Sequence, residues 1–157
     1  MTERNSTNIE RSLELEVIDA PLLFRSKQLW TPIGARGVFG GQVIGLGLAA
    51  ATKTVDSTFQ VHSLHCYFLM AGDNSIQIIY KVDEIRTGRT YATRFVNATQ
   101  RGRTIFTMMV SYAVPEISVL KWQESMPIVP KPNSLKSDVE ELEGYLQNPS
   151  FSLFHST

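Results

Sequence analysis

GQVIGLGLAAATK, residues 41–53, is the stretch of sequence that decides the fold. We predict a helix here that is apolar on nearly every side; its apolar residues are Val43, Ile44, Leu46, Leu48, Ala49, Ala50 and Ala51. A helix without a polar face must be surrounded by protein. Gly45 and Gly47 each cost about 1 kcal/mol relative to alanine inside a helix, so we expect neighbouring backbone to approach closely at these two positions.

Four strand-like runs follow the helix, at residues 60–70, 75–85, 91–100 and 103–114, with glycine-containing turns between them. Alternate residues share one face in two of these runs. The two sets are Ile76, Ile78, Tyr80 and Val82, and Phe106, Met108, Val110, Tyr112 and Val114. Such alternation is typical of an antiparallel sheet with one buried face. The sequence therefore predicts an α+β fold in which an antiparallel meander wraps a central helix.

The chain also divides into segments of different character. We expect a mobile N-terminus at 1–12, a folded domain at 13–115 that opens with a strand at 13–18, and a linker with a short helix at 116–157. Ser137 and Glu140 have capping-box spacing at the start of that helix. The sequence stops soon afterwards without a second strand-rich region, as expected of a chain cut before a second domain.

Composition excludes several classes of protein. Fifteen basic and fifteen acidic residues cancel in a chain of 157, so we expect no nucleic-acid or membrane partner. A single cysteine, Cys66, excludes an internal disulfide and a multi-cysteine zinc site. The longest apolar run, at residues 43–51, is far shorter than the roughly 20 residues of a membrane helix. We expect a soluble protein without metal or cofactor.

Three glycines precede the helix and suggest a binding function. Gly37, Gly40 and Gly41 flank Val38 and Phe39. Backbone N–H groups at a helix N-terminus are free donors, and they can stabilise a thioester carbonyl as it becomes an oxyanion. The pattern lacks the residues of a P-loop or a dinucleotide-binding fingerprint. The alternative interpretation, that small residues let a loop enter a tight core, stays open.

Histidines and arginines supply the other candidates. His62 and His65 point to opposite faces of one strand, so they do not form a joint metal site. His62 is either an acid–base group or a hydrogen-bonded structural residue. The stretch between Ile85 and Pro115 has no acidic residue and carries Arg86, Arg89, Arg94, Arg101 and Arg103. These arginines either bind phosphates or are solvated residues of turns.

A general base is missing from the predicted helix. Thioester hydrolysis needs a base or nucleophile near the carbonyl. The helix has no Asp or Glu, and the nearest acidic residue after it is Asp56.

Four segments, RGVFGGQVIGLGLAAA, VHSLHCYFLMAGD, IIYKVDEIRTGRTYATR and GRTIFTMMVSYAVPE, occur in the order found in a known family. Over about residues 10–128 the chain resembles the N-terminal half of type II acyl-CoA thioesterases, peroxisomal branch. The resemblance implies a hotdog fold and a full-length protein of two hotdog halves that hydrolyses fatty acyl-CoA to fatty acid and coenzyme A. It also implies that the catalytic aspartate, hydroxyl residue and glutamine belong to the second half.

The resemblance therefore assigns no catalytic residue to this chain. We expect Gly40, Gly41, Gln42 and His62 to frame or contact the substrate, and Arg86, Arg89 and Arg94 to contact coenzyme A. The alternative function is a truncated form that binds acyl-CoA or a partner without turnover. We expect pairing with a second hotdog domain or a second copy. The family implies a peroxisomal location, although His155-Ser156-Thr157 is not an SKL-type signal; the other expected location is cytoplasmic.

Overall fold

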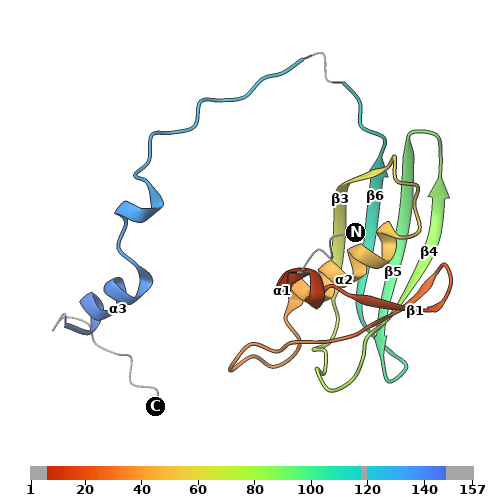
Figure 1. Cartoon of the computed structure of the whole chain (residues 1–157), viewed down its shortest axis with the longest axis horizontal. Coiled ribbons are helices and arrows are strands. Elements are labelled where there is room, and N and C mark those ends of the chain that lie inside the picture. Colours follow the sequence, from red (N-terminus) through yellow and green to blue (C-terminus); the bar gives the residue numbers. More distant parts are fainter. Residues whose placement is uncertain (1–6, 118–119, 148–157) are drawn as a thin grey trace, which may run out of the picture. The chain divides into compact units, whose positions relative to one another are not determined.

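Helix α2, Gly40–Thr52, lies against one face of a single antiparallel sheet in the computed structural model, which describes residues 7–117 and 120–147 (Figure 1). The six strands have the order β1-β2-β4-β5-β6-β3. Their bounds are β1 Leu15–Asp19, β2 Leu23–Ser26, β3 Gln60–Phe68, β4 Ile79–Thr87, β5 Tyr91–Gln100 and β6 Arg103–Ala113. This arrangement confirms the predicted α+β fold and the predicted helix, which begins one residue earlier than expected. The predicted meander is wrong at its first step, because β3 crosses over to pair with β6 and does not form a hairpin with β4.

The strand register aligns the core residues in rows across the sheet. Val82 pairs with Val96, Val96 pairs with Met108, and Met108 pairs with Cys66 on the edge strand β3. The predicted alternation is confirmed at its central positions, because these residues are buried: Ile78, Tyr80, Val82, Phe106, Met108, Val110 and Tyr112. The outermost positions, Ile76 and Val114, are only half-buried. The core therefore lies between α2 and the strands β4, β5 and β6.

The packing of α2 corrects two expectations. Val43, Leu46 and Ala50 face the sheet and are buried, whereas Ile44 and Leu48 on the other side are only half-buried. The prediction that protein surrounds the helix is wrong for the described part of the chain, because the sheet covers one side of it.

Side chains, not backbone, approach the two helix glycines. A Cβ at Gly45 would lie 2.7 Å from Cδ2 of Leu13, and a Cβ at Gly47 would lie 3.2 Å from Cε of Met108. These glycines therefore make room for a leucine and a methionine, so the expectation of close backbone approach is wrong.

Two elements near the N-terminus were not predicted. Helix α1, Asn8–Ser12, has a capping box in which Glu10 N–H donates to Thr7 Oγ1 (3.2 Å) and Thr7 N–H donates to the Glu10 carboxylate (2.6 Å). Residues 8–12 are therefore helical, a feature that was not predicted from the sequence, and residues 1–6 lie outside the described residues. Strand β2 has only four residues, too few for a period-2 pattern to be recognised.

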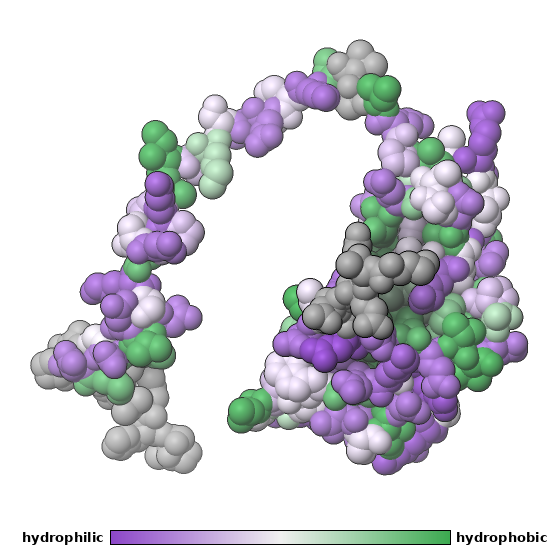
Figure 2. Space-filling model, viewed as in Figure 1, coloured by the Kyte–Doolittle hydropathy of each residue, from purple (hydrophilic) through white to green (hydrophobic). Residues whose placement is uncertain are grey.

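The chain divides into two compact units after Ile117. In the second unit the residues from 120 onward are extended as far as a 3-10 turn, Pro132–Ser134, and helix α3, Asp138–Gln147, follows. The predicted capping box is present, with Ser137 N–H donating to the Glu140 carboxylate (2.7 Å). Figure 2 shows hydrophobic residues scattered among hydrophilic ones along this segment. Trp122 and Ile128 are among its exposed apolar side chains. None of the described helices is both long and apolar enough to cross a membrane.

Candidate functional site

The glycine-rich N-terminus of α2 carries two free backbone donors. Phe39 precedes the helix as its N-cap, and no side chain caps it. The Phe39 carbonyl accepts from the N–H of Gln42 (3.0 Å) and from that of Val43 (3.2 Å). Among residues 7–117 and 120–147, no acceptor contacts the N–H of Gly40 or Gly41. Because the helix dipole adds partial positive charge, this helix start suits a developing negative charge.

The same glycines are required for close packing. A Cβ at Gly40 would lie 3.2 Å from Cζ of the Phe68 ring, and a Cβ at Gly41 would lie 2.6 Å from Cε1 of Phe39. At Gly37 a Cβ would lie 2.7 Å from the carbonyl oxygen of Gly72. The interpretation that small residues let the loop enter a tight core is therefore confirmed. It does not exclude a binding role, because the packing leaves the two N–H groups free.

A pocket of about 460 Å³ opens beside Gly40. The loop before α2 forms one wall, held by the hydrogen bond from Val38 N–H to the Gly72 carbonyl (2.9 Å), and the end of β3 with the start of β6 forms the other. The lining is mostly apolar and has one charged residue, Arg36; its larger apolar side chains are Val38, Phe39, Val43, Phe68, Leu69, Met70, Ile105 and Phe106. The pocket thus combines an apolar cavity with a helix N-terminus.

Gln42 lies at this helix start, but both ends of its side-chain amide form hydrogen bonds within the protein. Its Oε1 accepts from Trp30 N–H (2.9 Å), and its Nε2 donates to the carbonyls of Ser12 (2.8 Å) and Gln28 (2.9 Å). The side chain is buried. Of the two roles expected for Gln42, the geometry supports framing, since the amide ties the N-terminal segment and the loop to α2.

The structure does not bring His62 to the glycines. His62 lies at the start of β3, where the pairing with β6 is irregular, and its Nε2 is 2.9 Å from Ser111 Oγ. The Tyr91 ring packs edge-on against it, with ring centroids 5.8 Å apart. Phe68, which touches Gly40, ends the same strand six residues later, roughly 20 Å away at 3.3 Å per residue. His62 is thus an exposed, hydrogen-bonded residue at the far end of the edge strand.

Arg94 is not available to a ligand, which corrects its predicted contact with coenzyme A. The side chain is buried, with 1% of its surface exposed. Its Nε donates to Thr54 Oγ1 (2.8 Å), its Nη1 to the carbonyls of Arg86 and Thr93 (both 3.0 Å), and its Nη2 to Thr54 O (2.9 Å) and Thr87 Oγ1 (3.0 Å). A guanidinium has five N–H donors, so all of them are used. Arg94 fixes the loop after α2 to the end of β4.

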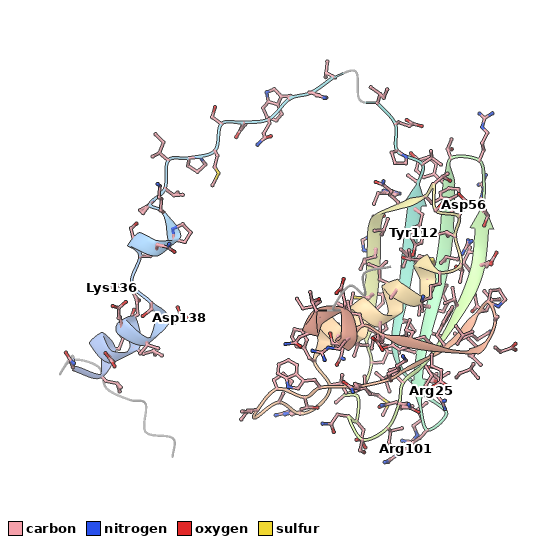
Figure 3. The ribbon with its side chains drawn as sticks, viewed as in Figure 1. Arg25, Asp56, Arg101, Tyr112, Lys136 and Asp138 are labelled. Carbon is pink, nitrogen blue, oxygen red and sulfur yellow. The ribbon has the colours of Figure 1, made fainter. Side chains whose placement is uncertain are left out.

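Arg86 and Arg89 are exposed, but they lie at the end of the sheet opposite the pocket. They flank the turn between β4 and β5, next to the strand end where Ala92 pairs with Tyr112. Figure 3 shows Tyr112 and Arg101 toward opposite ends of the sheet. Phe68 and Phe106, which line the pocket beside Gly40, pair with each other near the start of β6, on the Arg101 side. The expected coenzyme A contacts of Arg86 and Arg89 therefore stay predictions, separate from this pocket.

Among the residues that the structure describes, none that lines the pocket can act as a general base. Its lining residues include no Asp, Glu, His, Ser, Thr or Cys. Asp56 accepts from the N–H (2.9 Å) and hydroxyl (2.8 Å) of Thr58, and these bonds hold the pKa of its carboxyl below the usual value. It lies in the loop after α2, at the other end of the helix from Gly40. Within the described residues, no group of three or more His, Cys, Asp or Glu is arranged to hold a metal ion.

Sequence reasoning did not assign Arg36 to the site. Arg36 lies between Gly34 and Gly37. A charged residue inside a glycine-rich loop next to a helix N-terminus could have identified it as a candidate site residue. It lines the pocket beside Gly40.

The comparisons with known proteins agree with this geometry. Residues 27–113 match the family model of the acyl-CoA thioesterase N-terminal domain. Acyl-coenzyme A thioesterase 8 from Mus musculus is 41% identical over 138 residues, which are 88% of this chain and 42% of the mouse protein. Peroxisomal acyl-coenzyme A thioester hydrolase 1 from Saccharomyces cerevisiae is 38% identical over 109 residues, covering 69% of this chain and 31% of the yeast protein.

A solved structure extends the likeness to three dimensions. Acyl-CoA thioesterase II TesB2 from Mycobacterium marinum superposes with a TM-score of 0.69 at 36% identity, over 80% of this chain and 45% of that one. The sheet and its helix are therefore the hotdog fold of thioesterases, as predicted. The chain belongs to the acyl-CoA thioesterase N-terminal domain family. It spans less than half the length of these curated relatives.

Replacing Arg94 by methionine tests its structural role. We expect the free energy of unfolding to fall by at least about 2 kcal/mol, because buried carbonyl and hydroxyl groups lose their donors. Urea unfolding followed by circular dichroism measures this change. The exposed Arg86→Met variant is the matched control and should change stability by less than about 0.5 kcal/mol. Equal losses in the two variants would contradict the assignment.

Proposed function

We propose that this chain is the N-terminal half of an acyl-CoA thioesterase that hydrolyses fatty acyl-CoA to free fatty acid and coenzyme A. The observation that carries the proposal is the pair of free N–H groups at Gly40 and Gly41, with Gly40 opening onto an apolar pocket. Family membership supports the same class of reaction.

The chemistry divides between the two halves. Water attacks the thioester carbonyl, the C–S bond breaks, and the thiolate of coenzyme A takes up a proton. In our proposal the N–H groups at the start of α2 stabilise the oxyanion that forms during the attack. The base that activates water comes from the second half, in line with the carboxylate-free lining of the pocket.

The second candidate is an acyl-CoA-binding chain without turnover. The observation that favours it is the same absence of Asp, Glu and His from the pocket lining. The two candidates differ only when a second half is present. Hydrolysis that appears when the second half is supplied supports the thioesterase, and binding without hydrolysis in that assembly supports the alternative.

A pair of substitutions at Gly40 tests the oxyanion site in a protein that contains both halves. Gly40 is the first residue of α2, where proline is tolerated. Phe39 has ψ 120°, which lies in the range of a residue before proline and outside the α-helical region that proline disfavours there. Gly40→Pro removes one free N–H, whereas Gly40→Ala keeps it and adds a similar clash with Phe68.

We expect Gly40→Pro to lower kcat for acyl-CoA hydrolysis by roughly 100-fold or more relative to Gly40→Ala, the usual effect of losing an oxyanion donor. A coupled thiol assay measures the rate, and thermal unfolding checks that both variants fold. Equal kcat in the two variants would remove Gly40 from the mechanism. Substantial hydrolysis by the unaltered 157-residue chain alone would show that the base lies within it.

Strand β3 is the basis for the proposed partner. It forms one edge of the sheet, and the exposed apolar residues Val61, Tyr67 and Phe68 lie along it. An open edge with unpaired N–H and C=O groups favours pairing with another strand. We propose that a second hotdog domain occupies this edge, or a second copy when no such domain is present.

Light scattering on the purified chain at micromolar concentration tests the pairing. We expect the mass of a dimer, and Val61→Lys on the edge should shift the mass toward monomer. A monomer mass for the unaltered chain would contradict the proposal.

The proposed compartment is the peroxisome, supported by the name of the yeast relative. Imaging beside a peroxisomal marker tests it, and a cytosolic pattern would exclude it.

A further inference from the structure

Three adjoining hollows surround the loop at residues 70–74. The pocket beside Gly40 shares Met70, Ala71 and Ile105 with a second pocket of about 370 Å³. A third, of about 320 Å³, is lined by Ala71, Gly72 and Asp73 on one side and by Arg36 and Gly37 on the other. Because they share lining residues, the three hollows adjoin one another around this loop, and we refer to them together as the groove.

The groove is positively charged. Its lining carries three arginines, Arg36, Arg101 and Arg103, and one carboxylate, Asp73. We call these three residues the arginine groove. All three are exposed, and Arg101 Nη2 lies 3.3 Å from Asp73 Oδ2. Among the described residues, Arg36 and Arg103 have no ion-pair partner. Three cations against one anion favour a ligand with more than one negative charge.

Internal hydrogen bonds hold the loop of the groove in place. The buried Gln100 side chain accepts from Asp73 N–H (2.8 Å) and donates to the carbonyls of Asp73 (2.7 Å) and Ile76. Asp73 Oδ1 accepts from the Ser75 hydroxyl (2.6 Å) and N–H (2.9 Å). These bonds, together with the charge of Arg101, hold the pKa of Asp73 below its usual value. The loop that lines the groove is thus preorganised by hydrogen bonds within the protein.

Arg101 has a backbone conformation that its residue type disfavours. It has φ 50° and is followed by Gly102 with φ 72° in the turn between β5 and β6. Two consecutive positive φ angles define a turn that strongly prefers Asn-Gly or Asp-Gly. A bulky residue in the left-handed region is uncommon, and such residues cluster at functional sites. Asparagine would fit this backbone conformation better than arginine. The presence of arginine at this position therefore indicates that its side chain has a function.

We propose that the arginine groove binds the phosphates of the nucleotide end of acyl-CoA, while the pocket beside Gly40 takes the thioester end. The proposal rests on the proposed function. Guanidinium groups bind phosphate oxygens in a bidentate manner, and several of them at one site match a polyphosphate. The groove and the free N–H of Gly40 lie at the same end of the sheet, so one ligand reaches both. Arg86, Arg89 and Arg94 lie elsewhere.

The conformation of Arg101 allows a variant that loses the charge without losing the fold. In the double variant Arg101→Asn/Arg103→Gln, asparagine suits the turn better than arginine, so we expect a melting temperature equal to or above that of the unaltered chain. Arg25→Gln/Lys81→Gln, which removes the charges of half-buried Arg25 and exposed Lys81, neither of which lines the groove, is the matched control. Arg86→Gln/Arg89→Gln tests the competing assignment.

Calorimetric titration of the 157-residue chain with coenzyme A and with pantetheine separates the phosphates from the thiol arm. We expect the unaltered chain to bind coenzyme A more tightly than pantetheine, and the groove variant to bind coenzyme A roughly tenfold or more weakly. Its affinity for pantetheine should not change, and the Arg25/Lys81 control should bind coenzyme A like the unaltered chain.

Four results would overturn the proposal. In the first two, the groove variant keeps its affinity for coenzyme A, or it loses affinity for pantetheine as much as for coenzyme A. In the third, the Arg86/Arg89 variant loses affinity for coenzyme A and the groove variant does not. In the fourth, the unaltered chain does not bind coenzyme A. The test is independent of turnover. If a two-half protein binds coenzyme A through these arginines but does not hydrolyse acyl-CoA, the proposed function is wrong and the arginine groove stands. If it hydrolyses acyl-CoA without any dependence on these arginines, the groove proposal is wrong and the proposed function stands.

Discussion

The packing of Leu46, Ala50 and Ala51 against the sheet fixes α2, and the candidate site depends on this contact. Full burial of one leucine side chain contributes about 1.5–3 kcal/mol. At the far end of the helix, the Tyr112 hydroxyl lies 3.1 Å from Thr52 Oγ1. At the near end, Gln42 joins the helix to two preceding segments. Because both ends are held, the free N–H groups have a defined position, and Gly40 lies beside the pocket.

Much of the fold could be predicted from the sequence. The apolar helix, the hairpins β4-β5 and β5-β6 and the capping box at Ser137 were predicted from strong local patterns, whereas the pairing of β3 with β6 was not predicted. Strand β2 and helix α1 were missed because four or five residues carry too little periodicity. The half-exposed side of α2 was missed for another reason, since an apolar sequence does not reveal how far the sheet extends around it.

The site was predictable only in part. The glycines identified the helix N-terminus, but which end of each strand lies beside it depends on the sheet order. That order separates His62 and Arg89 from the pocket and brings Arg101 next to it. In β5, Arg94 points to the same face of the sheet as Ala92, Val96 and Ala98, which are all buried. This alternation could have identified Arg94 as an inward-facing residue, whereas its position among other arginines suggested a phosphate ligand.

Amide hydrogen exchange of the 157-residue chain tests the central claim most directly. In this account the amides of residues 44–51 exchange as slowly as those of β5 and β6, because the helix opens only when the sheet does. The amides of Gly40 and Gly41 exchange quickly, since no described residue accepts a hydrogen bond from them. If the amides of residues 44–51 exchanged as fast as those of α3, which has no buried residue, the helix would not be seated on the sheet and the site would have no fixed geometry.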